Sequence, residues 1–210
     1  MHLFLIRHGE TDWNSEGRVQ GHTDTPLNVR GIEQAGKLAA RLATEKIDAV
    51  YTSPLARARV TADRIAHALG VVAIPDERLK EKYLGDLEGI TEAEFEQQHA
   101  ELYRAWRANA VHYSLPGEEA PPALQERVQA FLDHVRGEHP SGTQVAVVSH
   151  GGTLGMFLAT LIGLDINRRL PFWFDNASIS QVDLSGMRPR LRLLNDTCHL
   201  RNGHNHSENL

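Results

Sequence analysis

The 210-residue sequence has little of several features that define whole classes of protein. It contains one cysteine, Cys198, so neither an intrachain disulfide framework nor a cysteine-rich metal site is available to it. No stretch approaches the ~18 consecutive apolar residues that a membrane-spanning helix needs. The first residues run into an apolar segment, without the charged stretch that begins a signal peptide. We therefore expect no membrane partner and a cytoplasmic location.

Positive charge is also scarce, with 22 Lys and Arg against 27 Asp and Glu and a net charge of −5. Proteins that bind nucleic acid usually carry a basic stripe, so we expect no nucleic-acid partner. The hydrophobic content of 41% is ordinary for a globular protein. We predict a single domain over residues 1–200 and a disordered tail over 201–210, which is rich in Asn and His.

Two apolar segments, far apart in the chain, end in the same way. Residues 2–6 lead into Arg7-His8-Gly9, and residues 145–148 lead into Ser149-His150-Gly151. Such runs suit strands buried on both faces of a parallel sheet, where ligands bind at the carboxyl ends. Side by side, the two imidazoles would share an anion-attracting pocket with a helix N-terminus. On the first segment alone, a structural interpretation, with His8 in the core and Arg7 on the surface, is as good as a functional one.

The first part of the chain predicts alternating strands and helices. Apolar periodicity predicts a helix over residues 30–43, with Asn28 as its cap. A strand over 47–52 is followed by a second helix, which we expect Ser53 to cap and Gly70 to end. With a third strand over 71–74, the order is βαβαβ, which predicts a mostly parallel sheet.

The second part interrupts this alternation. Residues 76–140 are predicted to form a loop and a helical insertion, with helices over 91–109 and 123–136, that covers a site as a lid. Two strands over 178–184 and 190–194 are predicted to form an antiparallel edge. The fold class we predict is α/β, a three-layer α/β/α sandwich with a mostly parallel sheet, an antiparallel edge and a helical insertion.

Five segments, in order along nearly the whole chain, resemble the motifs of the histidine phosphatase superfamily, also called phosphoglycerate mutase-like. They are Leu5–Asn14, Gln20–Asn28, Tyr51–Ala58, Leu79–Glu81 with Gly85–Gly89, and Ser149–Gly152. An Arg-His-Gly triplet alone would be weak evidence, whereas five ordered segments are specific.

The resemblance implies a role for each matched residue. His8 would attack phosphorus and form a phosphohistidine, and Glu81 would protonate the leaving oxygen and then deprotonate the attacking water. The residues that would hold the phosphoryl oxygens are Arg7, Arg57, His150 and Asn14. Further candidate substrate contacts in these motifs are Gln20, Gly21, His22, Thr23 and Gly151. No metal and no other cofactor is implied.

The residue types suit this chemistry. Two guanidinium groups spread positive charge over the oxygens of a transferring phosphoryl group, and a neutral imidazole forms a covalent intermediate. Nearby arginines favour the neutral form of His8, while the sequence leaves the protonation of His150 open. The assignment of Glu81 as the proton donor depends most on its place in the motif. Other carboxylates, such as Glu77 and Glu88, lie near it in the sequence, and carboxylates in loops are usually just solvated.

The function we predict is a metal-independent phosphomonoester hydrolase that acts on a small phosphorylated metabolite. The runner-up is a phosphoglycerate mutase, although Arg104 and Arg107 do not form the adjacent Arg-Arg pair that the resemblance leads us to expect of mutases. Two other classes stay open: an inactive phosphate-binding module, and a metallohydrolase using His8, His22 and His150. The sequence lacks the His-Glu-x-x-His motif that would support a metallohydrolase. Monomer and homodimer both remain open, and the substrate is not identified.

Overall fold

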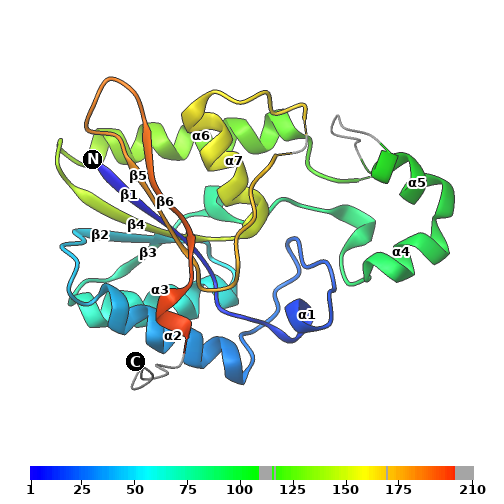
Figure 1. Cartoon of the computed structure of the whole chain (residues 1–210), viewed down its shortest axis with the longest axis horizontal. Coiled ribbons are helices and arrows are strands. Elements are labelled where there is room, and N and C mark those ends of the chain that lie inside the picture. The colour runs from blue at the N-terminus through cyan, green and yellow to red at the C-terminus, as the bar shows by residue number, and fades with distance from the viewer. Residues whose placement is uncertain (109–114, 116, 169, 202–210) are drawn as a thin grey trace, which may run out of the picture.

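The structure of the chain, a computed structural model, describes residues 1–108, 115, 117–168 and 170–201. A six-stranded sheet in the order β3-β2-β4-β1-β5-β6 forms its centre (Figure 1). Four strands are parallel: β1 (His2–Arg7), β2 (Ala49–Thr52), β3 (Ala73–Pro75) and β4 (Gln144–Ser149). The antiparallel edge consists of β5 (Ile179–Asp183), which pairs with β1, and β6 (Arg190–Asp196). The predicted mixed sheet is confirmed.

Helices cover both faces of this sheet (Figure 1). Leu3 and Leu5 of β1 pack in one hydrophobic cluster with α6 (Pro121–Glu138) and α7 (Gly151–Ile162). Phe4 and Ile6 point to the other face, where α2 (Val29–Leu42) and α3 (Ala56–Leu69) cover them. Burial on both faces is why the strands are continuously apolar, and it confirms the predicted three-layer arrangement.

The ends of the first helices follow the sequence signals only in part. The Asn28 side chain caps α2 by accepting a hydrogen bond from the Gly31 N–H, and Gly70 ends α3 with a φ of 72°, both as predicted. The prediction that Ser53 caps α3 is wrong, because that helix begins at Ala56 and the Ser53 hydroxyl contacts His150 instead. The short helix α1 (Asp12–Ser15) follows the His8 segment, and Thr11 caps it through a capping box.

The predicted insertion contains two different kinds of element. The short helices η1 (Glu77–Leu79) and η2 (Gly85–Leu87) precede α4 (Glu92–Gln98) and α5 (Ala100–Ala108), so the single helix predicted over 91–109 is broken at His99. Helices α4 and α5 extend away from the sheet and share a small cluster around Phe95, whereas α6 lies in the main helical layer (Figure 1). Whether the insertion acts as a lid stays a prediction.

Three strands differ by a few residues from their predicted bounds. Strand β2 begins two residues later than predicted, β3 lies at Ala73–Pro75, and β6 runs on to Asp196 before η3 (Cys198–Leu200). No helix in the described ranges is long and apolar enough to cross a membrane. The predicted disordered tail lies outside those ranges, except for Arg201.

Candidate active site

Strand pairing brings the two histidines together. β1 and β4 are parallel neighbours, with Arg7 opposite Ser149, so His8 and His150 follow at adjacent carboxyl ends. Their ring centroids lie 5.0 Å apart, and both side chains are buried. The prediction that these two strand ends lie side by side is confirmed. Because ligands bind at the carboxyl ends of strands in such sheets, we expect the functional site at this edge.

The His8 ring is held in one tautomer. Its Nδ1 lies 2.7 Å from the carbonyl oxygen of Gly9, which can only accept, so Nδ1 carries the proton. Burial, and then the charges of Arg7 and Arg57, hold the pKa of His8 well below its ordinary value. The ring is therefore neutral at pH 7, and its Nε2 carries a lone pair that can act as a nucleophile.

His150 lies beside His8 with both ring nitrogens engaged by the protein. Arg57 Nε donates to its Nδ1 at 3.3 Å, so the proton of the neutral ring is on Nε2, which donates to Ser53 Oγ at 2.8 Å. Burial, and then the Arg57 charge, hold the pKa of His150 well below its ordinary value. This answers the question that the sequence left open: His150 is neutral at pH 7.

Arg57 enters the site from the first turn of α3 and is completely buried. Its Nη1 and Nη2 donate to the carbonyl oxygens of Thr23 and Gly21, both at 2.8 Å. That loop is in turn fixed by Glu88, whose carboxylate accepts from the backbone N–H of His22 and from Thr23. Burial lowers the pKa of Arg57 to about 10, so the group keeps its charge at neutral pH.

Arg7 provides the second cation. Its Nη1 donates to the carbonyl oxygen of Phe174, while its Nε is buried and has no hydrogen-bond partner among the residues the structure describes. Burial lowers the pKa of Arg7, and the nearby carboxylates of Glu81 and Asp175 oppose this effect. A buried, unpartnered N–H of a charged group is costly unless a ligand completes it, so this N–H is a candidate donor to an anionic ligand.

The carboxylate of Glu81 lies at the N-terminus of α7. Its two oxygens accept hydrogen bonds from the backbone N–H groups of Gly152 at 3.1 Å, Thr153 at 3.0 Å and Lys82 at 2.8 Å. A Cβ at residue 152 would lie 2.7 Å from Glu81 Oε1, so the carboxylate would have to move away from a side chain there. Glycine at this position therefore lets the carboxylate approach the helix.

The amide of Asn14 is also oriented. Its Oδ1 accepts from the Thr11 N–H at 3.2 Å and from Asn176 Nδ2 at 3.0 Å, which leaves its NH₂ group to face elsewhere. Asn176 Nδ2 also donates to the carbonyl oxygen of His8 at 3.2 Å. Asn176 was not predicted from the sequence, because nothing in Phe-Asp-Asn-Ala-Ser distinguishes it from a turn residue.

These groups surround a cavity of about 510 Å³. Of the candidate residues, those on its wall are Arg7, His8, Asn14, Gln20, Gly21, Arg57, Glu81 and Gly151. His150, His22 and Thr23 do not line it: His150 lies behind His8, His22 Nε2 is 2.7 Å from the Glu81 carbonyl oxygen, and Thr23 binds Glu88. The predicted roles of all these residues stay predictions.

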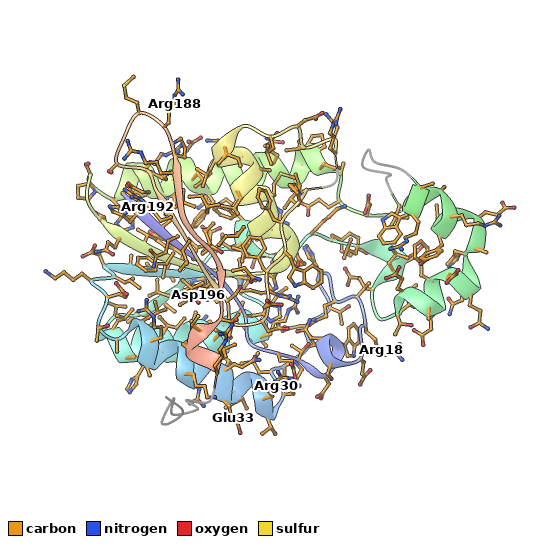
Figure 2. All side chains as sticks on the ribbon, viewed as in Figure 1. Arg18, Arg30, Glu33, Arg188, Arg192 and Asp196 are labelled. Carbon is orange, nitrogen blue, oxygen red and sulfur yellow. The ribbon has the colours of Figure 1, made fainter. Side chains whose placement is uncertain are left out.

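Apolar residues that were not predicted also line the cavity. They are Val19, Leu84, Leu170, Phe172, Trp173 and Phe174. The only sequence signal was the aromatic run before Asp175, which matches neither a helix nor a strand period. Arg18, labelled in Figure 2, also lines the cavity, and its Nη1 pairs with Glu94 of α4 at 2.8 Å. The insertion therefore contacts the cavity wall through this ion pair.

Positive charge and a neutral nucleophile are the chemical content of the site. Three arginines, Arg7, Arg18 and Arg57, line the cavity together with His8 and Glu81. In the part of the chain that the structure describes, no group of three or more His, Cys, Asp or Glu side chains is placed to hold a metal ion. The arrangement can bind a tetrahedral oxyanion, attack it and move a proton.

Comparison with known proteins agrees with this geometry. A family model described as histidine phosphatase superfamily (branch 1) matches residues 3–197. Phosphoserine phosphatase 1 of Hydrogenobacter thermophilus is 36% identical over 198 residues, which cover 94% of this chain and 93% of that protein. An Escherichia coli protein named probable phosphoglycerate mutase GpmB is 36% identical over 183 residues, 87% of this chain and 85% of its own length.

The solved structures include a mycobacterial glucosyl-3-phosphoglycerate phosphatase in complex with VO₃. It superposes with a TM-score of 0.86 at 30% identity and covers 93% of this chain and 99% of its own. The likeness therefore extends over both the sheet and the insertion.

Proposed function

The chain belongs to the histidine phosphatase superfamily, branch 1, and on that basis we propose that it hydrolyses phosphomonoesters of small metabolites through a phosphohistidine, without a metal ion. Its relatives include phosphatases of phosphoserine and of glucosyl-3-phosphoglycerate. The observation that carries the proposal is the neutral His8 beside the guanidinium groups of the buried Arg57 and the half-buried Arg7, whose buried Nε–H has no partner among the described residues. Positive charge without a metal suits the oxygens of a transferring phosphoryl group.

In the first step the ester phosphate binds between Arg7 and Arg57. The lone pair of His8 Nε2 attacks phosphorus as the bond to the ester oxygen breaks. Glu81 enters this step as the carboxylic acid: the leaving oxygen takes its proton, and the carboxylate that remains serves as the base of the second step. The Gly9 carbonyl accepts from Nδ1 at 2.7 Å and so stabilises the positive charge that develops on the ring. The products of this step are an alcohol and phosphorylated His8.

In the second step water attacks the phosphorylated ring. Glu81 accepts a proton from that water, the P–N bond breaks, and His8 returns to its neutral form as inorganic phosphate leaves. A properly placed acid and base contributes roughly 10² to 10⁴ in rate. Glu81, on the cavity wall with His8, is the described carboxylate that we assign to both transfers.

A mutase would return the phosphoryl group to a second hydroxyl of the substrate, and the likeness to the Escherichia coli protein keeps this activity as the alternative. The structure favours hydrolysis, because Arg104 and Arg107 do not line the cavity: Arg104 donates to the Ala100 carbonyl and Arg107 pairs with Glu92. The cytoplasmic location, and the choice between monomer and homodimer, stay predictions.

The test is turnover of p-nitrophenyl phosphate, O-phosphoserine and 3-phosphoglycerate in excess EDTA, by the unmodified protein, His8→Ala and the surface control His67→Ala. We expect turnover by the unmodified protein and His67→Ala, and its loss in His8→Ala. Acid-labile, base-stable phosphate should appear on the unmodified protein after rapid quenching. Loss of turnover in EDTA, or retained turnover in His8→Ala, contradicts the proposal. Conversion of 3-phosphoglycerate to 2-phosphoglycerate without phosphate release identifies a mutase instead.

A further inference from the structure

Arg127, in the middle of α6, reaches the loop that carries Glu81. We propose that Arg127 is a positioning residue for proton transfer: it holds the backbone of residues 78–81 so that the Glu81 carboxylate meets the leaving oxygen. The inference rests on the proposed function, because it assumes that Glu81 is the proton donor. Arg127 does not line the cavity, so we assign it an indirect role, exerted through the backbone of the loop that carries Glu81.

The guanidinium of Arg127 uses all five of its N–H donors. Nη1 donates to the carbonyl oxygens of Arg78 at 2.6 Å and Lys80 at 2.7 Å, and Nη2 donates to the Glu81 carbonyl oxygen at 3.0 Å. The other two donors, on Nε and Nη2, meet the carboxylate of Glu119 at 2.7 Å and 2.9 Å. One side chain thus fixes three carbonyl oxygens within four consecutive residues.

These carbonyl oxygens depend on side-chain donors. Beyond η1 the chain over residues 80–84 has no regular secondary structure. Ser149 Oγ donates to Leu79 O at 2.8 Å and Thr153 Oγ1 to Lys80 O at 2.7 Å, which ties this segment to β4 and α7. Arg127 ties the same segment to α6. The segment is therefore fixed to β4, α6 and α7, and the Glu81 carboxylate lies on the N-terminus of α7.

Glu119 completes the arrangement on the far side of Arg127. Its backbone N–H donates to the Tyr83 carbonyl oxygen at 2.9 Å, and its Oε2 lies 3.3 Å from the Tyr83 N–H. The loop after Glu81 is therefore bound to the start of α6 by the ion pair and by backbone contacts together. A loosened Arg127 would free the chain on both sides of Glu81.

Lysine cannot replace this arginine. Its single ammonium group can keep the ion pair with Glu119, but it cannot reach three carbonyl oxygens with the spread of a planar fork. A catalytic group displaced by about 1 Å can lose on the order of 10²-fold in rate. Because Glu81 protonates the leaving oxygen, the loss must depend on how much the leaving group needs that proton.

The experiment compares kcat/KM for p-nitrophenyl phosphate, whose leaving group is a stable anion, and for glycerol 2-phosphate, whose alkoxide needs protonation. This ratio reports only the steps up to formation of the phosphoenzyme, so slow dephosphorylation does not mask the effect. The variants are Arg127→Lys and Arg127→Gln, with Glu81→Gln as reference. The matched control is Arg136→Lys, an exposed arginine two turns further along α6 that pairs with Asp133.

We expect Arg127→Lys to lose roughly 10- to 100-fold in kcat/KM for glycerol 2-phosphate and less than about threefold for p-nitrophenyl phosphate, following the pattern of Glu81→Gln with a smaller magnitude. Arg136→Lys should match the unmodified protein on both substrates. Equal losses on both substrates, in Arg127→Lys and in Arg127→Gln, would mean a general structural role and overturn the inference, as would unchanged kinetics.

Failure of the proposed function has a different signature. If the unmodified protein hydrolyses neither ester, or Glu81→Gln shows no dependence on the leaving group, then the assignment of Glu81 falls and the inference about Arg127 falls with it. If Glu81→Gln shows the dependence and the Arg127 variants do not, only the role of Arg127 is refuted.

Discussion

The closest backbone approach near the candidate nucleophile gives a sharp test of the structure. A Cβ built on Gly31, in the first turn of α2, would lie 2.0 Å from the carbonyl oxygen of Glu10 and 2.8 Å from its nitrogen. A Cβ on Gly9 would in turn lie 2.5 Å from the Gly31 carbonyl oxygen. The loop that follows His8 therefore rests directly on α2, and Gly31→Ala must push it away.

The same helix contains a control for the effect of alanine itself. Gly36 lies mid-helix, and a Cβ there would meet nothing within 4 Å. Gly36→Ala should stabilise the protein by about 0.5–1 kcal/mol through helix propensity alone, which raises Tm by about 1–4 °C for a chain of this size. Gly31→Ala receives the same gain, but it must also open a contact that falls more than 1 Å short of the ordinary 3.4 Å.

Overpacking of this kind costs about 1–3 kcal/mol, and the obstacle is backbone rather than a flexible side chain. We therefore expect Gly31→Ala to lower Tm by about 2–6 °C, while Gly36→Ala raises it. Displacement of His8 should also reduce kcat/KM on the order of 10²-fold. The measurements are thermal unfolding and hydrolysis of p-nitrophenyl phosphate for both variants. Wild-type activity together with a raised Tm in Gly31→Ala would refute the reasoning.

Three further predictions concern the same site. Gly152→Ala should displace the Glu81 carboxylate, which lies 2.7 Å from the new Cβ, and so lower kcat/KM for alkyl phosphates by roughly 10- to 100-fold while Gly137→Ala, with open space at its Cβ, leaves it unchanged; equal activities would contradict this. Asn176→Asp replaces an amide donor by an acceptor opposite Asn14 Oδ1 and the His8 carbonyl oxygen. The free energy of unfolding should fall by about 1–3 kcal/mol, and inhibition by inorganic phosphate should weaken. Unchanged inhibition would refute the role of Asn176 in orienting Asn14. The folded protein holds the pKa of His8 and of His150 well below the unfolded value of about 6.5. The free energy of unfolding is therefore fully present above that pH and falls below it, by up to about 1.4 kcal/mol per pH unit for each ring. Urea unfolding measured from pH 7 to pH 5 should show a shallower fall in His8→Gln than in the unmodified protein.

The sequence predicted the layers of the fold well because buried parallel strands leave a simple signal. The apolar runs of β1 and β4 are continuous, since both of their faces are covered, and Asn28 and Gly70 mark helix ends by local chemistry. Ser53 shows where such signals fail. A serine before a proline is typical of a helix cap, yet here the hydroxyl serves His150, a residue that the fold brings to it from 97 positions away. Long-range partners compete with local propensity, and only the structure shows which prevails.

The candidate site divides in the same way. The candidate reacting residues come in compact motifs, so Arg7, His8, Arg57 and Glu81 could be named from the sequence, and the structure places them around one cavity. His150 and His22 could be named too, but not their surroundings: the first has both ring nitrogens engaged by Arg57 and Ser53, and the second supports the Glu81 carbonyl. The apolar lining residues Leu170, Phe172, Trp173 and Phe174 come from a segment without periodicity, so no pattern pointed to them.

Supporting residues are harder to find than reacting ones for a physical reason. A reacting group must be a particular residue at a particular place, whereas a supporting group needs only to deliver donors to a backbone that can be reached from many positions. Arg127 illustrates this: in the sequence it is one arginine beside the inward positions Leu124 and Val128 of an amphipathic helix, a place that surface arginines often occupy. The informative detail is that it lies next to the apolar face, where a charge is costly unless it is paired. An arginine at such a boundary, in a helix that follows the motif of the proposed proton donor, is therefore the kind of residue to test first for a positioning role.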